Sequence, residues 1–182
     1  MKNRHIPSND EVQVIQKLRD ELAELRQKMR SDFNRHVSLP DLLTDRWETA
    51  SFYGFGEGTS CYNNVLIIGD VRVGTNCWIG PNVVLDGSGG LEIGDYCSIS
   101  AGVQIYSHHT VAWSTTFGQA TVERKSTRIG SGVYIGPNAV IQMGSTIGSR
   151  AVIGAMSLVN CDVPDDTKCF GIPGRIKHEA KS

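Results

Sequence analysis

Two adjacent histidines, His108 and His109, stand where a regular chain is interrupted. Aliphatic residues recur every six positions up to Ile105 and again from Ile129, and the repeat frame is the same on both sides. Segment 106–128 lacks this pattern, so we expect it to loop out of the repeating structure. Loops on a rigid scaffold often carry function, and imidazole exchanges protons near neutral pH. The two histidines are therefore the first candidates for chemistry.

The alternation of side chains along an extended strand favours one of the two histidines. If Val103 and Ile105 point inward, Tyr106 and His108 point outward, since successive side chains face opposite sides. His109 would then turn inward or bend away. We expect His108 to be the functional residue, with His109 as the second choice; the alternative is that His108 is an ordinary surface histidine.

The repeat itself predicts the fold. Two residues are inserted near 87–90, and otherwise one frame holds from Ile67 to Val159. A six-residue period is a signature of the parallel β-helix, in which each unit is a short strand and a corner. The aliphatic positions are Ile67, Val73, Ile79, Leu85, Ile93, Ile99, Ile105, Ile129, Ile135, Ile141, Ile147, Ile153 and Val159. The residues four places on are small or medium-sized, which relieves crowding at the corners. We expect an all-β solenoid.

Residues 9–36 are predicted to form one helix. Ser8 and Glu11 make a capping-box pattern, and Pro40 prevents the helix from continuing. Its apolar positions alternate at spacings of three and four and form a single stripe: Ile15, Leu18, Leu22, Leu25 and Met29. We favour packing of this stripe on the same subunit, with a coiled coil between subunits as the alternative.

Three parts of the chain follow from these patterns. Residues 1–61 comprise the helix and a capping segment with a short helical turn at 41–44. The segment holds an aromatic cluster of Trp47, Phe52, Tyr53 and Phe55. We expect this cluster to cover the open end of the core; contact with substrate is the alternative. Residues 62–164 form the β-helix, including the extruded loop at 106–128. Residues 165–182 form a tail outside the repeat.

Composition narrows the class of protein. A net charge of -1 and a pI near 6.5 argue against a nucleic-acid-binding protein. The five cysteines form no CxxC pair, so we interpret them as reduced thiols of a cytoplasmic protein. No apolar run is long enough to span a membrane, and the N-terminus lacks the apolar core of a signal peptide.

Four stretches carry a family resemblance: 93–99, 103–109, 128–136 and 171–176. Together they resemble the hexapeptide-repeat acyltransferases, and among them the sugar O-acetyltransferases that act on galactosides, maltose and polysaccharides. The resemblance covers about residues 62–177. It implies a left-handed β-helix, a homotrimer, and acetyl-CoA bound between neighbouring subunits, with no metal.

The resemblance also implies roles for individual residues. His108 matches the general base that takes a proton from the acceptor as it attacks the thioester. Asp86 and Asn82 fall near residues that bind the acceptor sugar, and we expect Tyr106 and Trp113 to help shape that site. The positions that match the CoA-binding stretches are Tyr134, Gly136, Gly154 and Ala155, with Lys168 and Arg175 as sources of positive charge.

Three positions depart from the family pattern. Asn160 and Cys161 stand where a lysine often lies near the CoA phosphates, and Met156 replaces a usual glycine, which would narrow the CoA channel. Pro137 has no N–H to offer to the thioester region. Any donor to the developing oxyanion must then come from another residue.

We expect an acetyl-CoA-dependent O-acetyltransferase acting on a saccharide. The first alternative is N-acetylation of a nucleotide-linked amino sugar, and the second is a non-catalytic binding scaffold. A zinc enzyme on this scaffold would need three converging imidazoles, whereas His5, His36 and His178 lie outside the repeats. A serine acetyltransferase is disfavoured because its helical N-terminal domain is much longer.

Overall fold

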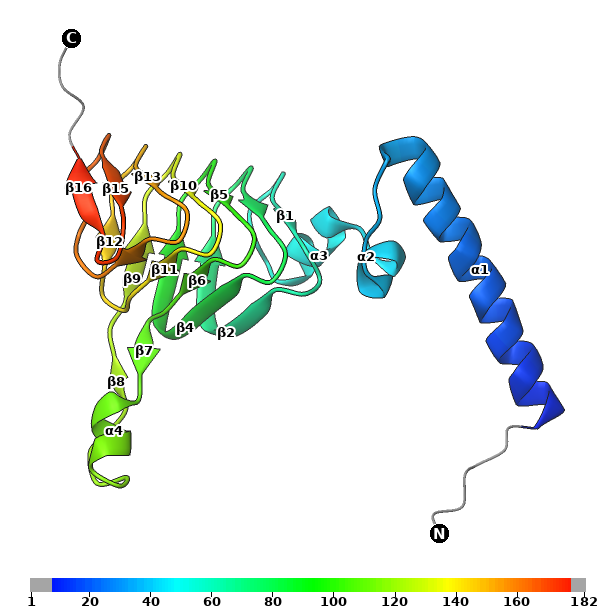
Figure 1. The fold of residues 1–182 in the computed structure, drawn as a ribbon, viewed down its shortest axis with the longest axis horizontal. Helices are drawn as coiled ribbons and strands as arrows, with labels where there is room; N and C mark the ends of the chain where they lie inside the picture. Colours follow the sequence, from blue (N-terminus) through cyan, green and yellow to red (C-terminus); the bar gives the residue numbers. More distant parts are fainter. Residues whose placement is uncertain (1–7, 178–182) are drawn as a thin grey trace. The chain divides into compact units, whose positions relative to one another are not determined.

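The computed structural model describes residues 8–177, which fall into two compact units that divide between Asp45 and Arg46. The first unit contains helices α1 (Asn9–Phe33) and α2 (Leu39–Leu43). The second contains helix α3 (Arg46–Phe52) and the solenoid (Figure 1). Within residues 8–177, no helix is both long and apolar enough to cross a membrane.

Helix α1 begins as its sequence predicts and ends earlier. Ser8 and Glu11 form the predicted capping box. The helix was expected to reach residue 36, but it stops at Phe33 because Asn34 adopts a left-handed conformation with φ of 50° and closes the C-terminus. Pro40 does not end this helix; it lies in the first turn of α2, where a missing N–H costs nothing.

The solenoid is a parallel β-helix, as the repeat predicts, and its first sheet forms one face. Equivalent residues lie sixteen or more positions apart in the chain and stand in register, as in the column Trp78, Ser98 and Tyr134. The final strand pairs antiparallel and closes the stack. This first face contains β1 (Ser60–Cys61), β3 (Trp78–Ile79), β5 (Ser98–Ile99), β10 (Tyr134–Ile135), β13 (Val152–Ile153), β15 (Lys168–Phe170) and β16 (Arg175–Lys177).

A second sheet wraps around a corner and supplies two further faces. The second face contains the first halves of β2 (Leu66–Val73) and β4 (Val84–Ile93), followed by β6 (Gln104–Ile105), β11 (Val140–Ile141) and β14 (Leu158–Val159). The third face contains the second halves of β2 and β4 with β9 (Thr127–Ile129) and β12 (Thr146–Ile147). The inserted residues at 87–90 lie at the corner where β4 changes face.

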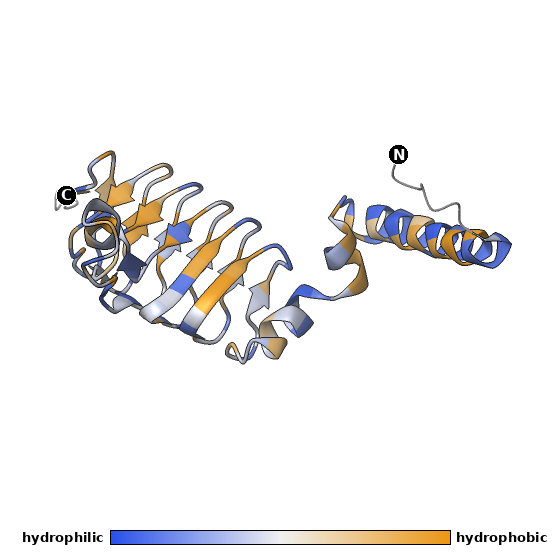
Figure 2. Cartoon of the chain, turned by 90° about the horizontal axis from the view of Figure 1, so that it is seen from below, coloured by the Kyte–Doolittle hydropathy of each residue, from blue (hydrophilic) through white to orange (hydrophobic). Residues whose placement is uncertain are grey.

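The core is the aliphatic ladder predicted from the repeat. All its positions are buried except Ile67, which is partly buried and packs against the same cluster. Figure 2 shows the hydrophobic strands stacked along the solenoid. Stacked aliphatic side chains bury apolar area from turn to turn, which is the main stabilising term in such repeats.

Both ends of the solenoid differ from the simplest expectation. Ala50 and Phe55 are buried in the core cluster, whereas Phe52 is 85% exposed, so the aromatic segment covers the core end with only part of its side chains. At the other end, the tail expected outside the repeat continues it: β15 pairs parallel with β13, and Cys169 is fully buried.

The interruption in the repeat forms an arm that projects from the solenoid (Figure 1). Strand β7 (His108–His109) leaves the second face, helix α4 (Val111–Thr115) follows, and β8 (Glu123–Arg124) returns antiparallel to β7. The chain re-enters the ladder at β9. The arm therefore begins at the two histidines, as the pattern predicted.

Candidate active site

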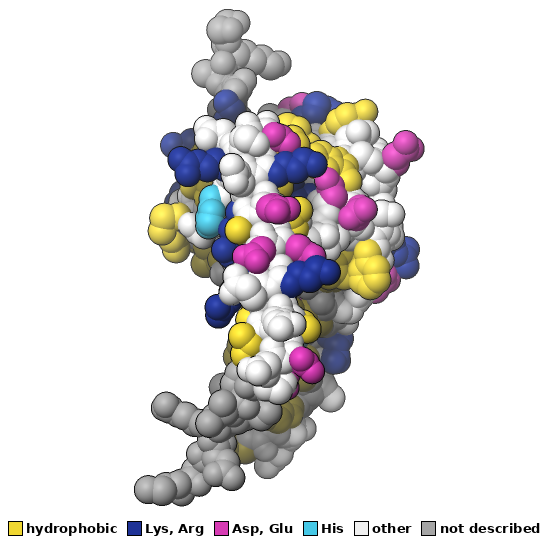
Figure 3. Space-filling model, turned by 90° about the vertical axis from the view of Figure 1, so that its right-hand side faces the viewer, with side chains coloured by type: hydrophobic (Ala, Val, Ile, Leu, Met, Phe, Trp, Pro, Cys, Tyr) yellow, Lys and Arg dark blue, Asp and Glu magenta, His cyan; other side chains and the backbone are white. Residues whose placement is uncertain are grey.

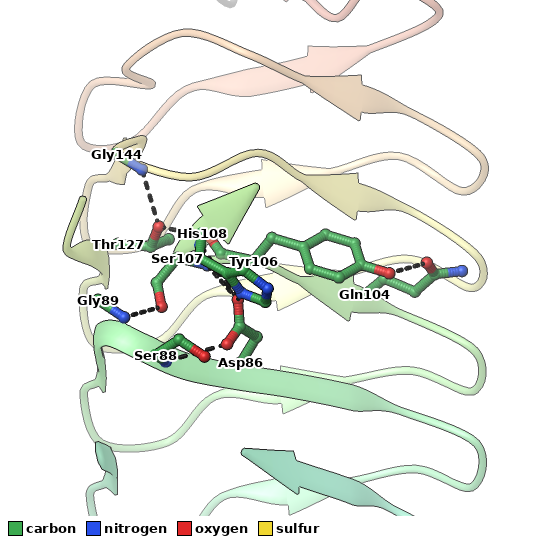
Figure 4. A network of polar contacts seen from close by, with 9 residues as sticks. All are labelled: Asp86, Ser88, Gly89, Gln104, Tyr106, Ser107, His108, Thr127 and Gly144. Carbon is green, nitrogen blue, oxygen red and sulfur yellow. Dashed lines mark hydrogen bonds and ion pairs between the residues drawn. The ribbon is translucent and has the colours of Figure 1, made fainter. Parts of the chain in front are cut away.

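His108 lies at the base of the arm with its ring held against a buried carboxylate. Its Nδ1 is 2.5 Å from Oδ2 of Asp86, which belongs to β4 on the preceding coil (Figure 4). The His108 side chain is 28% exposed, whereas that of Asp86 has no exposed surface. Ser107 lies between Tyr106 and His108 in the chain and is fully buried, which confirms the alternation that turns those two residues outward.

The Asp86 carboxylate is saturated with donors from the backbone. Its Oδ2 accepts hydrogen bonds from the amides of Ser107 at 2.9 Å and His108 at 3.1 Å, and its Oδ1 accepts one from the Ser88 amide at 2.9 Å. Burial raises the pKa of Asp86, but the hydrogen bonds from the Ser88 side chain, these amides and the histidine ring outweigh burial and lower the pKa to about 2. Asp86 is ionised at neutral pH.

This carboxylate fixes the tautomer of the histidine. An ionised carboxylate only accepts hydrogen bonds, so Nδ1 of His108 carries the proton in the neutral ring. Nε2 is then left with its lone pair as a proton acceptor. Asp86 was expected to contact the acceptor sugar. Its side chain has no exposed surface in this subunit and faces His108 instead, so the structure gives it a contact that the prediction did not include.

The inserted residues of β4 form the socket for the strand that carries His108. The Gly89 amide donates to the Ser107 hydroxyl at 2.8 Å. A Cβ at Gly89 would lie 2.4 Å from the Ser107 carbonyl oxygen and 2.8 Å from the Lys125 amide nitrogen, both backbone atoms. Only glycine allows this approach. The insertion, which obscures the alignment in the sequence, therefore positions the histidine.

The two ends of the arm are fastened to each other at the same place. The Lys125 amide donates to the Ser107 carbonyl oxygen at 2.9 Å. The buried Thr127 hydroxyl donates to the Tyr106 carbonyl oxygen at 2.7 Å. The Thr127 hydroxyl also accepts from the Gly144 amide at 3.0 Å, which ties the arm to the following coil (Figure 4). The base of the arm is held from three coils.

His108 opens onto a cleft of about 650 Å³ along the second face. The Tyr106 ring forms part of its wall, and its hydroxyl donates to Gln104 at 2.7 Å. The mixture of imidazole, amide and apolar side chains suits a polar acceptor molecule. The lining residues are Tyr106, His108, His109, Thr110, Val111, Val140, Gln142 and Met143.

Three other predicted residues take no part in the Asp86–His108 contact, although His109 lines the same cleft. His109 bends away from Asp86, with its Nε2 3.6 Å from Glu123 across the arm. Trp113 is 49% exposed on α4 of the arm. Asn82 lies at the opposite end of the second face, where its side-chain oxygen accepts from Asn64 at 2.9 Å in a corner ladder, so the structure explains it without a ligand.

The residues expected to bind the cofactor lie on another face of the prism. Tyr134 and Lys168 point out of the first face in one column, with Val152 between them, and Ala155 is exposed at the next corner. Arg175 is exposed on β16. A single subunit therefore does not bring these residues together with His108.

The two predicted glycines have a packing role as well. Gly136 and Gly154 are buried, and a Cβ at Gly136 would lie 2.5 Å from the amide nitrogen of Ala155 on the next coil. The neighbouring Pro137 offers its carbonyl oxygen to the Met156 amide at 2.9 Å. Pro137 thus supports the corner at which Met156 is exposed.

Sequence reasoning missed one contact in the site and one exposed aromatic residue on the first face. It did not find the Asp86–His108 contact, because the two residues are twenty-two positions apart and the inserted corner shifts the register between them. It also passed over Trp78, which is 68% exposed on the first face and separated from Tyr134 only by the small Ser98. The available signal was a large aromatic residue at an outward position of the repeat.

Within residues 8–177, no group of three or more His, Cys, Asp or Glu side chains gathers in a way that could hold a metal ion. His36 is among these residues, and His5 and His178 lie outside the described residues.

Comparison with known proteins places these features in context. Residues 126–161 match the model of the bacterial transferase hexapeptide, and residues 66–107 match that of the hexapeptide repeat of succinyl-transferase. A dTDP-4-amino-4,6-dideoxy-D-glucose acyltransferase of Escherichia coli is 31% identical over 144 residues, which are 70% of this chain and 74% of that protein. The galactoside O-acetyltransferase of Escherichia coli K12 is 29% identical over 59% of this chain and 63% of its own length.

A solved structure covers the whole chain. A hexapeptide-repeat acetyltransferase of Vibrio cholerae O1 biovar eltor, complexed with acetyl coenzyme A, superposes with a TM-score of 0.67 and 27% identity, covering 100% of this chain and 96% of that one. Among the curated relatives that match first, a serine acetyltransferase and two galactoside O-acetyltransferases, the chain spans 37% to 63% of their length.

Proposed function

This chain belongs to the hexapeptide-repeat acyltransferases, and from that membership we propose that it is an acetyl-CoA-dependent O-acetyltransferase acting on a saccharide. The observation that carries the proposal is the contact of 2.5 Å between Asp86 and Nδ1 of His108 beside an open cleft. An ionised, fully buried carboxylate that orients an imidazole toward a cleft is an arrangement for removing a proton from a bound nucleophile.

In the proposed reaction, a hydroxyl group of the acceptor binds in the cleft with its proton directed at Nε2 of His108. As the hydroxyl oxygen attacks the thioester carbonyl carbon, its proton passes to Nε2, and the imidazolium is stabilised by Asp86. The new C–O bond remains while the C–S bond breaks. The proton then passes from Nε2 to the departing sulfur, which leaves as the CoA thiol, so no covalent enzyme intermediate is needed.

We place acetyl-CoA along the first face of a neighbouring subunit. The column of Tyr134 and Lys168, with Ala155 and Arg175 nearby, offers aromatic, small and cationic groups for the pantetheine and phosphate parts, but lies on a different face from His108. A cyclic homotrimer would bring the first face of one subunit to the second face of the next. The reacting groups would then meet between subunits, where positioning supplies much of the rate.

The acceptor would bind between the arm and the solenoid. Tyr106 lines the cleft and Trp113 stands exposed on the arm, while Trp78 on the first face could be presented by the neighbouring subunit. Aromatic faces pack on sugar rings, and the hydroxyl groups of a sugar match the amide of Gln142 in the cleft wall. We also propose that the protein acts in the cytoplasm.

A second candidate is N-acetylation of a nucleotide-linked amino sugar. It is favoured by one observation, the 31% identity to an acyltransferase of dTDP-4-amino-4,6-dideoxy-D-glucose over 70% of this chain. The same histidine would then take a proton from an amino group. Tyr106 and the arm would form the sugar site in both cases.

One experiment separates the candidates. CoA release from acetyl-CoA is followed with a panel of glycosides and with nucleotide-linked amino sugars, each at matched concentrations. The O-acetyltransferase proposal expects turnover with at least one hydroxyl acceptor. Its product should be an ester, which hydroxylamine cleaves, whereas an amide product would resist hydroxylamine. Turnover restricted to amino acceptors would replace it with the second candidate, and no CoA release with either class would overturn both.

A further inference from the structure

No residue of helix α1 is buried, although the helix carries the apolar stripe of Ile15, Leu18, Leu22, Leu25 and Met29. Within the stripe, Ile15, Leu18 and Leu25 are 44%, 52% and 37% exposed. Helices in proteins gain most of their stability by packing such a face rather than from intrinsic propensity. We propose that the stripe packs against the α1 helices of other copies of this chain, in a parallel, in-register coiled coil.

The spacing of the stripe fits a short coiled-coil seam of two heptads. In heptad notation Ile15, Leu22 and Met29 occupy a positions, and Leu18 and Leu25 occupy d positions. A helix that packs on the body of its own subunit needs a broader face, with apolar residues added at e or g. Apolar residues occupy such flanking positions only toward the two ends of the helix, at Val12, Val14 and Phe33. In the two central heptads, from Leu18 to Met29, the flanking positions are all charged: Arg19, Glu21, Arg26 and Lys28. This narrow central seam is why we favour the coil over packing on the same subunit.

The charges beside the seam select the parallel orientation. In a parallel coil each g residue faces the e residue of the next heptad on the neighbouring helix, which sets Glu21 opposite Arg26. In an antiparallel coil e faces e, which would set Arg19 opposite Arg26. The Glu21 side chain is 60% exposed, and its ion-pair partner is Lys17 of the same helix at 3.9 Å, an exposed pair of the kind that contributes little. Pairing with Arg26 of a neighbouring helix would replace this contact. Figure 3 shows acidic, basic and hydrophobic side chains intermixed on this side of the molecule.

The orientation agrees with the oligomer proposed above. Helices related by a cyclic symmetry axis necessarily run parallel, so three α1 helices of a cyclic trimer can meet along one axis. In this respect alone the inference rests on the proposed function, since the number three comes from that proposal. The heptad pattern and the pairing of Glu21 with Arg26 stand without it.

Cysteine cross-linking of the full-length protein tests the seam. Leu18→Cys and Leu25→Cys are placed at d positions, and Gln27→Cys, at an outward f position, is the matched control with the same native cysteines. After mild oxidation we expect most chains of both seam variants to migrate as disulfide-linked dimers on a non-reducing gel, and fewer than one tenth in the control. The two seam positions, 18 and 25, are one heptad apart. Each can form a disulfide with the same position of a neighbouring helix only if the helices run parallel and in register.

Charge reversal provides the second test. In the Leu25→Cys background we expect Arg26→Glu to reduce cross-linking several-fold, and the double change Glu21→Arg with Arg26→Glu to restore it. Equal cross-linking in seam and control variants would overturn the coil. So would protection of Leu25→Cys from alkylation without cross-linking, which would mean packing on the same subunit, or sedimentation of the protein with vesicles of phosphatidylcholine and phosphatidylglycerol.

These measurements do not depend on acetyl transfer. A protein that releases CoA and has trimeric mass in light scattering, yet fails to cross-link at Leu18→Cys and Leu25→Cys, would refute the coil and leave the proposed function intact. A cross-linked protein without turnover would do the reverse.

Discussion

The carboxylate of Asp86 lies 2.5 Å from Nδ1 of His108, although the two residues belong to different coils of the solenoid and lie on either side of its inserted corner. Three backbone amides hold the carboxylate in place, so it orients the ring without moving itself. If His108 is the general base, Asp86 is the residue that positions it.

Asp86→Asn should impair the chemical step without unfolding the protein. The amide can donate to Nδ1 as readily as accept from it, so the ring would lose its fixed tautomer. We expect kcat to fall roughly 100-fold or more, with the KM for acetyl-CoA changed less than a few-fold. Steady-state kinetics and circular dichroism check this, and unchanged kcat in a folded variant would remove Asp86 from its role.

The same carboxylate should make the protein sensitive to acid. The pKa of Asp86 is about 2 in the folded state, against about 3.9 for an unfolded aspartate. Because the folded pKa is the lower one, its stabilisation is complete above about pH 5 and is lost as pH falls through 3.9 toward 2. The size of this stabilisation is roughly 3 kcal/mol.

Urea unfolding from pH 6 to pH 3 measures this linkage. The difference in unfolding free energy between the wild type and Asp86→Asn should narrow as pH falls. A difference that stays constant over this range would show that Asp86 does not carry the depressed pKa.

Gly89→Ala should displace the strand that carries the histidine. Its Cβ would lie 2.4 Å from a backbone oxygen of Ser107, so either β7 or the inserted corner must move. We expect a loss of activity of roughly 100-fold, since misplacing a catalytic group by about 1 Å has effects of this size.

Gly132→Ala is the matched control for this change. Gly132 has a φ of +70°, and its Cβ would meet only the Arg150 side chain at 3.6 Å and the Arg150 amide nitrogen at 4.0 Å. We expect it to cost about 1 kcal/mol of stability through backbone strain alone and to keep its activity. Equal losses of activity in the two variants would mean that the socket has no special role.

Mixing two inactive variants tests whether the site lies between subunits. His108→Ala removes the base, and Ala155→Trp fills the exposed corner where we place the cofactor. If the two halves come from neighbouring chains of a cyclic trimer, a random equal mixture rebuilds about one quarter of the sites. Activity is measured after co-expression of the two variants, with each variant alone as the control. If activity does not rise above that of the single variants, either His108 and the corner at Ala155 act within one chain or that corner is not part of the site.

The repeat predicted most of the fold, for a physical reason. Each hexad buries its own aliphatic residue against the same position one coil away, so a local pattern is also the tertiary contact, as in Ile99 and Ile135. The end of α1 was less predictable because it depends on Asn34 adopting a left-handed conformation. The extra rung at β15 escaped notice because its coil is shorter: Cys169 pairs with Ile153 only sixteen positions earlier, which breaks the six-residue frame.

The candidate site was predictable only in part. His108 was found because it stands at the break in the pattern and alternation turns it outward. The contact of Asp86 with His108 was not predicted because the burial of Asp86 depends on Ser107 and Ser88, and contacts between coils are not revealed by spacing along the chain. Trp78 was missed because a single exposed aromatic residue looks ordinary until the register sets it near Tyr134.

The comparison of His108→Ala with His109→Ala tests the central claim most directly. For acetyl-CoA and an acceptor that the wild type uses, we expect His108→Ala to lower kcat by roughly 100- to 10,000-fold, the range for loss of a general base. Its affinity for acetyl-CoA and its oligomeric mass should stay unchanged, and His109→Ala should stay within a few-fold of the wild type. Turnover by His108→Ala at the wild-type rate, or a loss confined to His109→Ala, would contradict the account.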